Sequence, residues 1–157
     1  CGFEGPVSEE RVLDMVRAYV AAGLRNISLA DTAGHADPVQ VERLFGQVFA
    51  LAPDLECTCH FHNTYGLGMA NIYAAMRAGV TSFETSFAGL GGCPFTRVAA
   101  GNVATEDFVH ALQRQGQRTD VDLDRLIEVA RDVATQFGRD LQGCVYKTGR
   151  IRKKEAS

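Results

Sequence analysis

The chain has 157 residues, of which 46% are apolar, and this is enough for one globular domain. Sixteen basic and nineteen acidic side chains give a net charge of −3, and the one basic run is the tail from Arg150 to Lys154, so we expect no nucleic-acid partner. No apolar run approaches the roughly 18 residues that a membrane-spanning helix needs, so we expect no membrane partner.

The cysteines are odd in number and lack the spacing of a disulfide framework: Cys1, Cys57, Cys59, Cys93 and Cys144. We therefore expect free thiols in a reducing compartment, either a bacterial cytoplasm or a mitochondrial matrix. The chain begins at Cys1 rather than Met and shows no targeting segment, which indicates a processed start or a start part-way through a gene.

Helical and extended patterns alternate along the chain. Helical spacing of apolar residues predicts helices from Ser8 to Gly23, from Asp37 to before Pro53, from about Ala70 to Gly79, from about Thr105 to Gln115, and from about Asp122 to Phe137. Strands are predicted over 26–31, 55–62 and 81–87, and a glycine-rich loop covers 88–102. In the first helix we expect Val12, Leu13, Val16, Tyr19 and Val20 to face inward. In the last helix we expect the same of Leu123, Leu126, Ile127, Ala130, Val133, Ala134 and Phe137.

Strands that alternate with helices of this length predict a parallel α/β sheet. No glycine-rich phosphate motif follows the first strand, which disfavours a dinucleotide-binding fold. Polar residues instead collect at the carboxyl ends of successive strands, where a (β/α)8 TIM barrel places its active site. We expect residues 1–148 to form the C-terminal half of such a barrel, roughly strands 6–8 with a remnant of strand 5 at Cys1–Phe3. Residues 149–157 are expected to form a disordered basic tail.

His60 and His62 stand one residue apart in a predicted strand. Successive strand side chains alternate between the two faces, so both imidazoles point to the same side. Two neutral imidazoles on one face can bind a divalent metal, although two hydrogen-bonded histidines in a polar patch would have the same spacing. Alternation sends Cys57, Cys59 and Phe61 to the other face, which excludes a zinc finger built from these thiols and imidazoles.

Other polar residues at the same edge have two or more interpretations. Asn102 could ligate a metal through its amide oxygen, but spacing alone favours a cap for the helix that follows. Asp31 could orient a ligand, hold a substrate hydroxyl or cap its own turn. Glu84 suits a hydrogen bond to a ligand better than proton transfer, and Cys93 is either a proton-transfer thiol or an ordinary loop residue. We expect solvated or structural roles for His35 and His110, and a core position for Cys144.

Four motifs in chain order together resemble 3-hydroxy-3-methylglutaryl-CoA lyase, a member of the metal-dependent TIM-barrel lyases and Claisen-type synthases. They are Ile27-Ser-Leu-Ala-Asp-Thr32, His60-Phe-His-Asn-Thr-Tyr-Gly66, Gly89-Leu-Gly-Gly-Cys-Pro94 and Gly101-Asn-Val-Ala-Thr-Glu-Asp107. The resemblance runs from near residue 1 to about Thr148. The Gly-Gly-Cys-Pro loop discriminates against the isopropylmalate and homocitrate synthases, which usually carry Gly-Glu-Arg-x-Gly-Asn there.

The resemblance implies a retro-Claisen cleavage of 3-hydroxy-3-methylglutaryl-CoA to acetyl-CoA and acetoacetate, as in leucine degradation and ketone-body metabolism. His60, His62 and Asn102 would bind Mg²⁺ or Mn²⁺, and the catalytic residues would be Cys93, Asp31 and His60. The partner would be an acyl-CoA substrate, and the full-length protein is expected to be a homodimer.

The chain departs from the lyase pattern at three points. Ala30 replaces a glycine and Asn63 replaces an aspartate that several of these lyases have; neither change removes a ligand. The Arg and Asp that the family's first strand supplies have no counterpart here, so we expect a fragment that is inactive alone. The alternatives are a related acyl-CoA lyase, a Claisen-type synthase, or a half-barrel without catalytic function.

Overall fold

The computed structural model describes residues 5–92 and 101–151. The predicted strand remnant at Cys1–Phe3, the loop residue Cys93 and the end of the basic tail lie outside these residues. Residue contacts divide the chain into two compact units, one with residues 1–84 and 92–102, the other with residues 85–91 and 103–157. Each unit is described by itself below.

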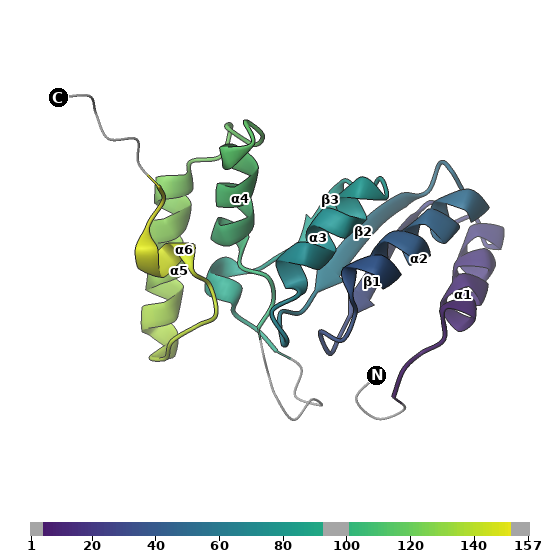
Figure 1. Cartoon of the computed structure of the whole chain (residues 1–157), viewed down its shortest axis with the longest axis horizontal. Helices are drawn as coiled ribbons and strands as arrows, with labels where there is room; N and C mark the ends of the chain where they lie inside the picture. Colours follow the sequence, from purple (N-terminus) through teal and green to yellow (C-terminus); the bar gives the residue numbers. More distant parts are fainter. Residues whose placement is uncertain (1–4, 93–100, 152–157) are drawn as a thin grey trace. The chain divides into compact units, whose positions relative to one another are not determined.

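The first unit is a parallel α/β sheet with its helices (Figure 1). Its helices are α1 (Glu9–Ala21), α2 (Pro38–Leu51) and α3 (Gly68–Arg77), and its strands are β1 (Asn26–Asp31), β2 (Glu56–Phe61) and β3 (Ser82–Glu84). The strands lie in the order β1-β2-β3, and both neighbouring pairs are parallel. The predicted alternation of helices and parallel strands is confirmed.

Local signals place the helix boundaries as expected. The Ser8 side chain accepts a hydrogen bond from the Arg11 backbone N–H and caps α1. Asp37 caps α2 by accepting from the N–H groups of Val39 and Gln40, with Pro38 at the first helical position. Gly79 has a φ of 106° just beyond α3, a conformation that favours glycine and ends the helix.

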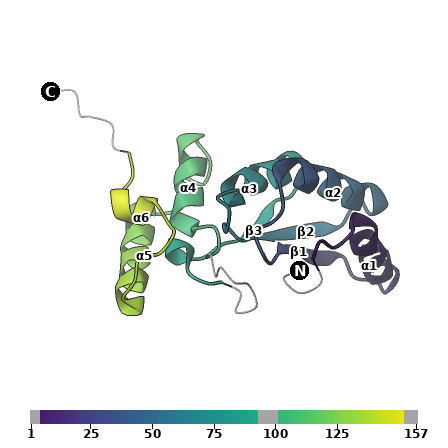
Figure 2. The same cartoon turned by 60° about the horizontal axis from the view of Figure 1, so that its bottom comes forward.

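The two faces of the sheet differ in burial. Cys57, Cys59 and Phe61 of β2 are buried together with Ile27 of β1, and Figure 2 shows α2 and α3 side by side over one face of the sheet. The opposite face carries the more exposed and mostly polar side chains of Ser28, Ala30, Thr58, His60, Ser82 and Glu84. The period of two therefore separates an apolar, helix-covered face from a polar one.

The third strand is shorter than predicted. It ends at Glu84 instead of Phe87, because the backbone leaves the sheet to bond elsewhere: the Ser86 N–H donates to the Val103 carbonyl and the Ser86 carbonyl accepts from the Thr105 N–H. Phe87 begins the short 3₁₀ helix η1 (Phe87–Gly89), in which Ala88 has a left-handed φ of 54°. The predicted extension of this strand to Phe87 is therefore wrong.

The second unit packs η1 with the helices α4 (Thr105–Arg114), α5 (Leu123–Phe137) and α6 (Val145–Thr148). Leu123, Ile127 and Ala130 of α5 are buried as predicted. Phe137 of α5 is 55% exposed and Tyr19 of α1 is 45% exposed. The prediction that these two side chains face the core is therefore wrong. Periodicity alone could not show where each helix loses contact with its neighbours.

Helix α6 was not predicted, and Cys144 just before it is exposed rather than in the core. The Asp107 carboxylate of α4 accepts hydrogen bonds from the N–H groups of Cys144 and Val145, which start this helix. A residue 37 positions away in the chain therefore stabilises this turn. Among the described residues, no helix combines the length and the apolar character needed to cross a membrane.

Candidate metal centre

His60 and His62 lie next to each other at the carboxyl end of β2. Their ring centroids are 5.1 Å apart, and the ring planes are inclined by 56°. The His60 side chain is 26% exposed, whereas His62 is buried. Because Cys59 and Phe61 are buried on the opposite face, the alternation inferred from sequence is confirmed for this strand.

Glu84 lies in register with His60 across the β2–β3 pair. The Glu84 Oε2 atom is 3.1 Å from the His60 Nδ1 atom, so the carboxylate can accept the Nδ1–H of a neutral imidazole. This hydrogen bond selects the tautomer with a free Nε2 lone pair, the arrangement in which carboxylate-bound histidines bind metals. The preference for Glu84 as a hydrogen-bond partner of a ligand agrees with this geometry.

Asn102 is next to His62 although it is forty positions later in the chain. The two residues form an isolated antiparallel backbone bridge, and the Asn63 N–H donates to the Gly101 carbonyl at 3.0 Å. The N-cap of α4 is Ala104, so the helix-cap interpretation of Asn102 is wrong. The backbone therefore holds the amide-bearing residue beside the second imidazole.

Asp31 has both carboxylate oxygens engaged by its own turn. Oδ1 accepts from the His35 N–H at 2.9 Å and Oδ2 from the Ala36 N–H at 3.0 Å. Asp31 is in register with Phe61 rather than with His60, which directs it to the helix-covered face. The structure supports the turn-capping role of Asp31 and does not bring it to the imidazoles; its catalytic role stays a prediction.

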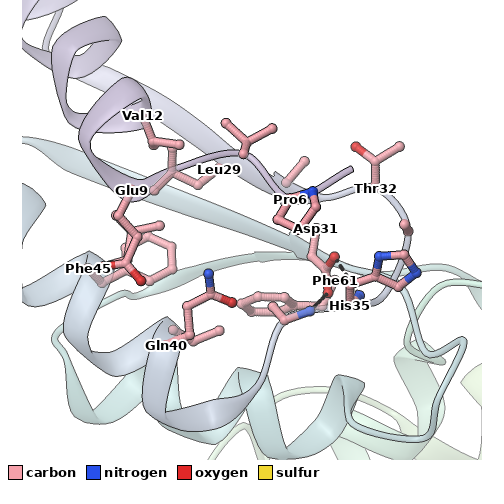
Figure 3. Close-up of a pocket in the computed structure, with 16 residues that line it drawn as sticks. Pro6, Glu9, Val12, Leu29, Asp31, Thr32, His35, Gln40, Phe45 and Phe61 are labelled. Carbon is pink, nitrogen blue, oxygen red and sulfur yellow. Dashed lines mark hydrogen bonds between the residues drawn. The ribbon is translucent and has the colours of Figure 1, made fainter. Parts of the chain in front are cut away.

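A cavity of about 390 Å³ lies between α1, β1 and α2 on that helix-covered face. Figure 3 shows Asp31 and His35 close together at one part of its wall; the rest of the wall combines apolar side chains with the polar side chains of Glu9 and Gln40. Its lining includes Leu29, Phe45 and Phe61 but neither imidazole of the candidate centre. Ala30, which is in register with His60, also borders this cavity, but the lining does not include the two imidazoles.

The donor set of the polar face fits a divalent cation. Two imidazole nitrogens and one amide oxygen are the mixed ligands that Mg²⁺, Mn²⁺ or Zn²⁺ accept. Within residues 5–92 and 101–151, no three His, Cys, Asp or Glu side chains come together as a ligand group. Asn102, whose backbone is bridged to that of His62, is the candidate for a third protein ligand.

The thiols of β2 do not contribute to this centre. Burial raises the pKa of Cys57 to about 11, and burial together with the nearby Glu84 and Cys57 raises that of Cys59 to about 12. Both stay protonated at neutral pH and are poor ligands and nucleophiles. Cys93, predicted as the catalytic thiol, lies outside the described residues.

Two buried polar residues were missed by sequence reasoning. Asn71 of α3 is fully buried and donates from Nδ2 to the Ala36 carbonyl at 2.9 Å, which ties α3 to the turn after β1. Glu106 of α4 is fully buried, its Oε2 accepts from the Ala88 N–H at 3.0 Å, and burial raises its pKa. Glu106 stands in the first turn of a helix, where an acid is usual, so only its burial reveals its role.

Comparison with known proteins identifies a family that this chain matches. A family model described as HMGL-like matches residues 1–133. The chain is 41% identical over 151 residues to an (R)-citramalyl-CoA lyase of Chloroflexus aurantiacus. The aligned region covers 96% of this chain and 48% of that protein. It is 40% identical to a hydroxymethylglutaryl-CoA lyase of Pseudomonas mevalonii over 88% of the chain and 46% of that protein.

A solved structure gives the same result for the fold. An HMG-CoA lyase of Acinetobacter baumannii, in complex with coenzyme A and 3-methylmalate, superposes with a TM-score of 0.90 at 42% identity. The match covers all of this chain and 52% of that one. The chain thus spans about half the length of the relatives that it matches.

Proposed function

This chain belongs to the HMGL-like family of TIM-barrel proteins and contains part of that barrel, and from this membership we propose that the protein is a metal-dependent carbon–carbon lyase. Its proposed substrate is a 3-hydroxy-3-methylacyl-CoA ester. One observation carries the proposal: the imidazoles of His60 and His62 lie next to each other at the carboxyl end of β2, with Asn102 bridged to His62.

We assign the cation, Mg²⁺ or Mn²⁺, to His60, His62 and Asn102. When bound, it would supply a Lewis acid that makes the substrate's 3-hydroxyl group more acidic. Glu84 would hold the His60 ring through Nδ1 and so keep Nε2 directed at the site. The Asp31 turn and Asn71 would hold the loops at this end of the sheet in place.

The reaction is a retro-Claisen cleavage. The 3-hydroxyl gives its proton to solvent water, the oxygen's electron pair forms a carbonyl at C3, and the bond between C2 and C3 breaks with its electron pair remaining on C2 of the acetyl-CoA fragment. That carbon then takes up a proton, for which Cys93 is the proposed donor. With 3-hydroxy-3-methylglutaryl-CoA the products are acetyl-CoA and acetoacetate.

A second substrate is favoured by a specific similarity. The Chloroflexus relative is named for (R)-citramalyl-CoA, an ester whose cleavage gives acetyl-CoA and pyruvate. Both esters carry a methyl group and a hydroxyl on C3, so the same metal and imidazoles would serve either. A Claisen-type synthase is disfavoured by the Gly-Gly-Cys-Pro loop, and a half-barrel without activity is the remaining alternative.

The decisive experiment uses the longest polypeptide that the gene encodes, loaded with Mg²⁺, and follows acetoacetate release from 3-hydroxy-3-methylglutaryl-CoA and pyruvate release from citramalyl-CoA. Release that EDTA abolishes would support the proposal. His62→Ala should abolish it too, whereas His35→Ala removes an exposed imidazole outside the pair and should leave it largely intact. A folded, metal-loaded protein that releases neither product would refute the lyase assignment.

A further inference from the structure

One row of side chains crosses the polar face of the sheet beside the candidate metal centre. The strand registers place Ala30 of β1 and Glu84 of β3 on either side of His60. Neighbouring strands are about 4.8 Å apart, so both flanking side chains border the space around the imidazole. Ala30 is exposed on this face, and its side chain is a single methyl group.

The two flanks of His60 differ in charge. On one side stands the Glu84 carboxylate, whose Oε2 is already 3.1 Å from His60 Nδ1. On the other side Ala30 offers only its methyl group. A carboxylate on a substrate held at His60 is repelled from the Glu84 side and is accommodated more easily on the Ala30 side.

The two candidate substrates differ in the arm that carries this carboxylate. In citramalyl-CoA the carboxylate is attached directly to C3, and in 3-hydroxy-3-methylglutaryl-CoA one methylene group separates them. The extra methylene is about as large as the methyl group by which alanine exceeds glycine. The Ala30 methyl group therefore occupies space beside His60 that the longer arm would need.

We infer that Ala30 is a specificity-determining residue, whose methyl group beside His60 favours the short-arm ester over the ester with the additional methylene. This inference rests on the proposed lyase function and goes beyond it, because it names the position that sets the acyl preference. It does not require Ala30 to bind metal or to transfer a proton.

The test measures kcat/KM for both esters with the longest encoded polypeptide and its Ala30→Gly and Ala30→Val variants. A methylene in an enclosed apolar site is worth roughly 10- to 200-fold in specificity, and this face is partly open, so we expect the lower end of that range. Ala30→Gly should raise the kcat/KM ratio of the long-arm to the short-arm ester roughly tenfold, and Ala30→Val should lower it.

Ser28→Gly is the matched control. Ser28 lies on the same face of the same strand, in register with Thr58 and one side-chain row away from His60, so the ratio should not change. A ratio does not depend on the fraction of folded enzyme, so general damage from a substitution would leave it unaltered. If the kcat/KM ratios of all three variants lie within twofold of the wild-type ratio, the inference about Ala30 is overturned and the proposed function is not. If the wild type cleaves neither ester, the proposed function is overturned and the inference with it.

Discussion

The hydrogen bond between Glu84 and His60 is the contact whose loss should be easiest to measure. Glu84→Ala removes the acceptor of His60 Nδ1 without touching a proposed ligand. Losing such a partner typically costs 10- to 100-fold in metal affinity, because the ring loses its orientation and part of its basicity. The Glu84 side chain is 54% exposed, so water can replace part of the hydrogen bond. We therefore expect about a tenfold weaker Kd, or about 1.4 kcal/mol.

Mn²⁺ titration followed by electron paramagnetic resonance on the longest encoded polypeptide measures this directly. Glu84→Gln keeps a carbonyl acceptor but loses the charge, so its affinity should lie between wild type and Glu84→Ala. Glu56→Ala, at the far end of β2, should bind Mn²⁺ like the wild type. If Glu84→Ala binds Mn²⁺ as tightly as the wild type while His62→Ala does not bind it, Glu84 does not orient a metal ligand.

Two further predictions concern stability. A Cβ at Gly143 would lie 2.6 Å from Glu106 Oε1, so Gly143→Ala should destabilise the protein by about 1–3 kcal/mol in urea unfolding. Gly46→Ala, in the middle of α2 with no atom near the new methyl, should instead stabilise it by about 0.5–1 kcal/mol, and equal effects of the two substitutions would contradict the packing argument. Burial raises the pKa of the Cys57 thiol to about 11 and that of Cys59 to about 12, whereas the pKa of a thiol in an unfolded chain is about 8.5. Below about pH 8.5 both thiols are protonated in the folded and the unfolded chain, so they do not lower the free energy of unfolding. Above that pH the unfolded thiols ionise first, so the free energy of unfolding should fall as the pH rises toward 12. A Cys57→Val, Cys59→Val double variant with the same dependence of unfolding free energy on pH as the wild type would refute this.

Much of the fold could be predicted because its signals are local. Ser8 and Asp37 cap their helices through side chains within three residues of the N–H groups that they bind. The alternation along β2 places His60 apart from Cys57 and Cys59, because a strand has a period of two whatever surrounds it. The resemblance of the ordered motifs to the lyases was confirmed by the family match.

The errors arose where a distant segment decides the structure. β3 stops at Glu84 because Ser86 bonds to residues 103 and 105, and α6 forms because Asp107 supplies its cap. Tyr19 follows the apolar period of its helix, yet it is exposed, because periodicity gives a face and not its neighbours. The predicted roles of Cys93 and of the tail stay predictions, since Cys93 and residues 152–157 lie outside the described part.

The sequence by itself determined which side chains share a face of each strand and where most helices begin and end. Only the tertiary structure decided which side chains meet across strands: Glu84 and Ala30 on either side of His60, and Asn102 beside His62. The physical reason is that the period of a strand is a property of its own backbone, whereas strand register and the return of a distant loop depend on packing between segments far apart in the chain.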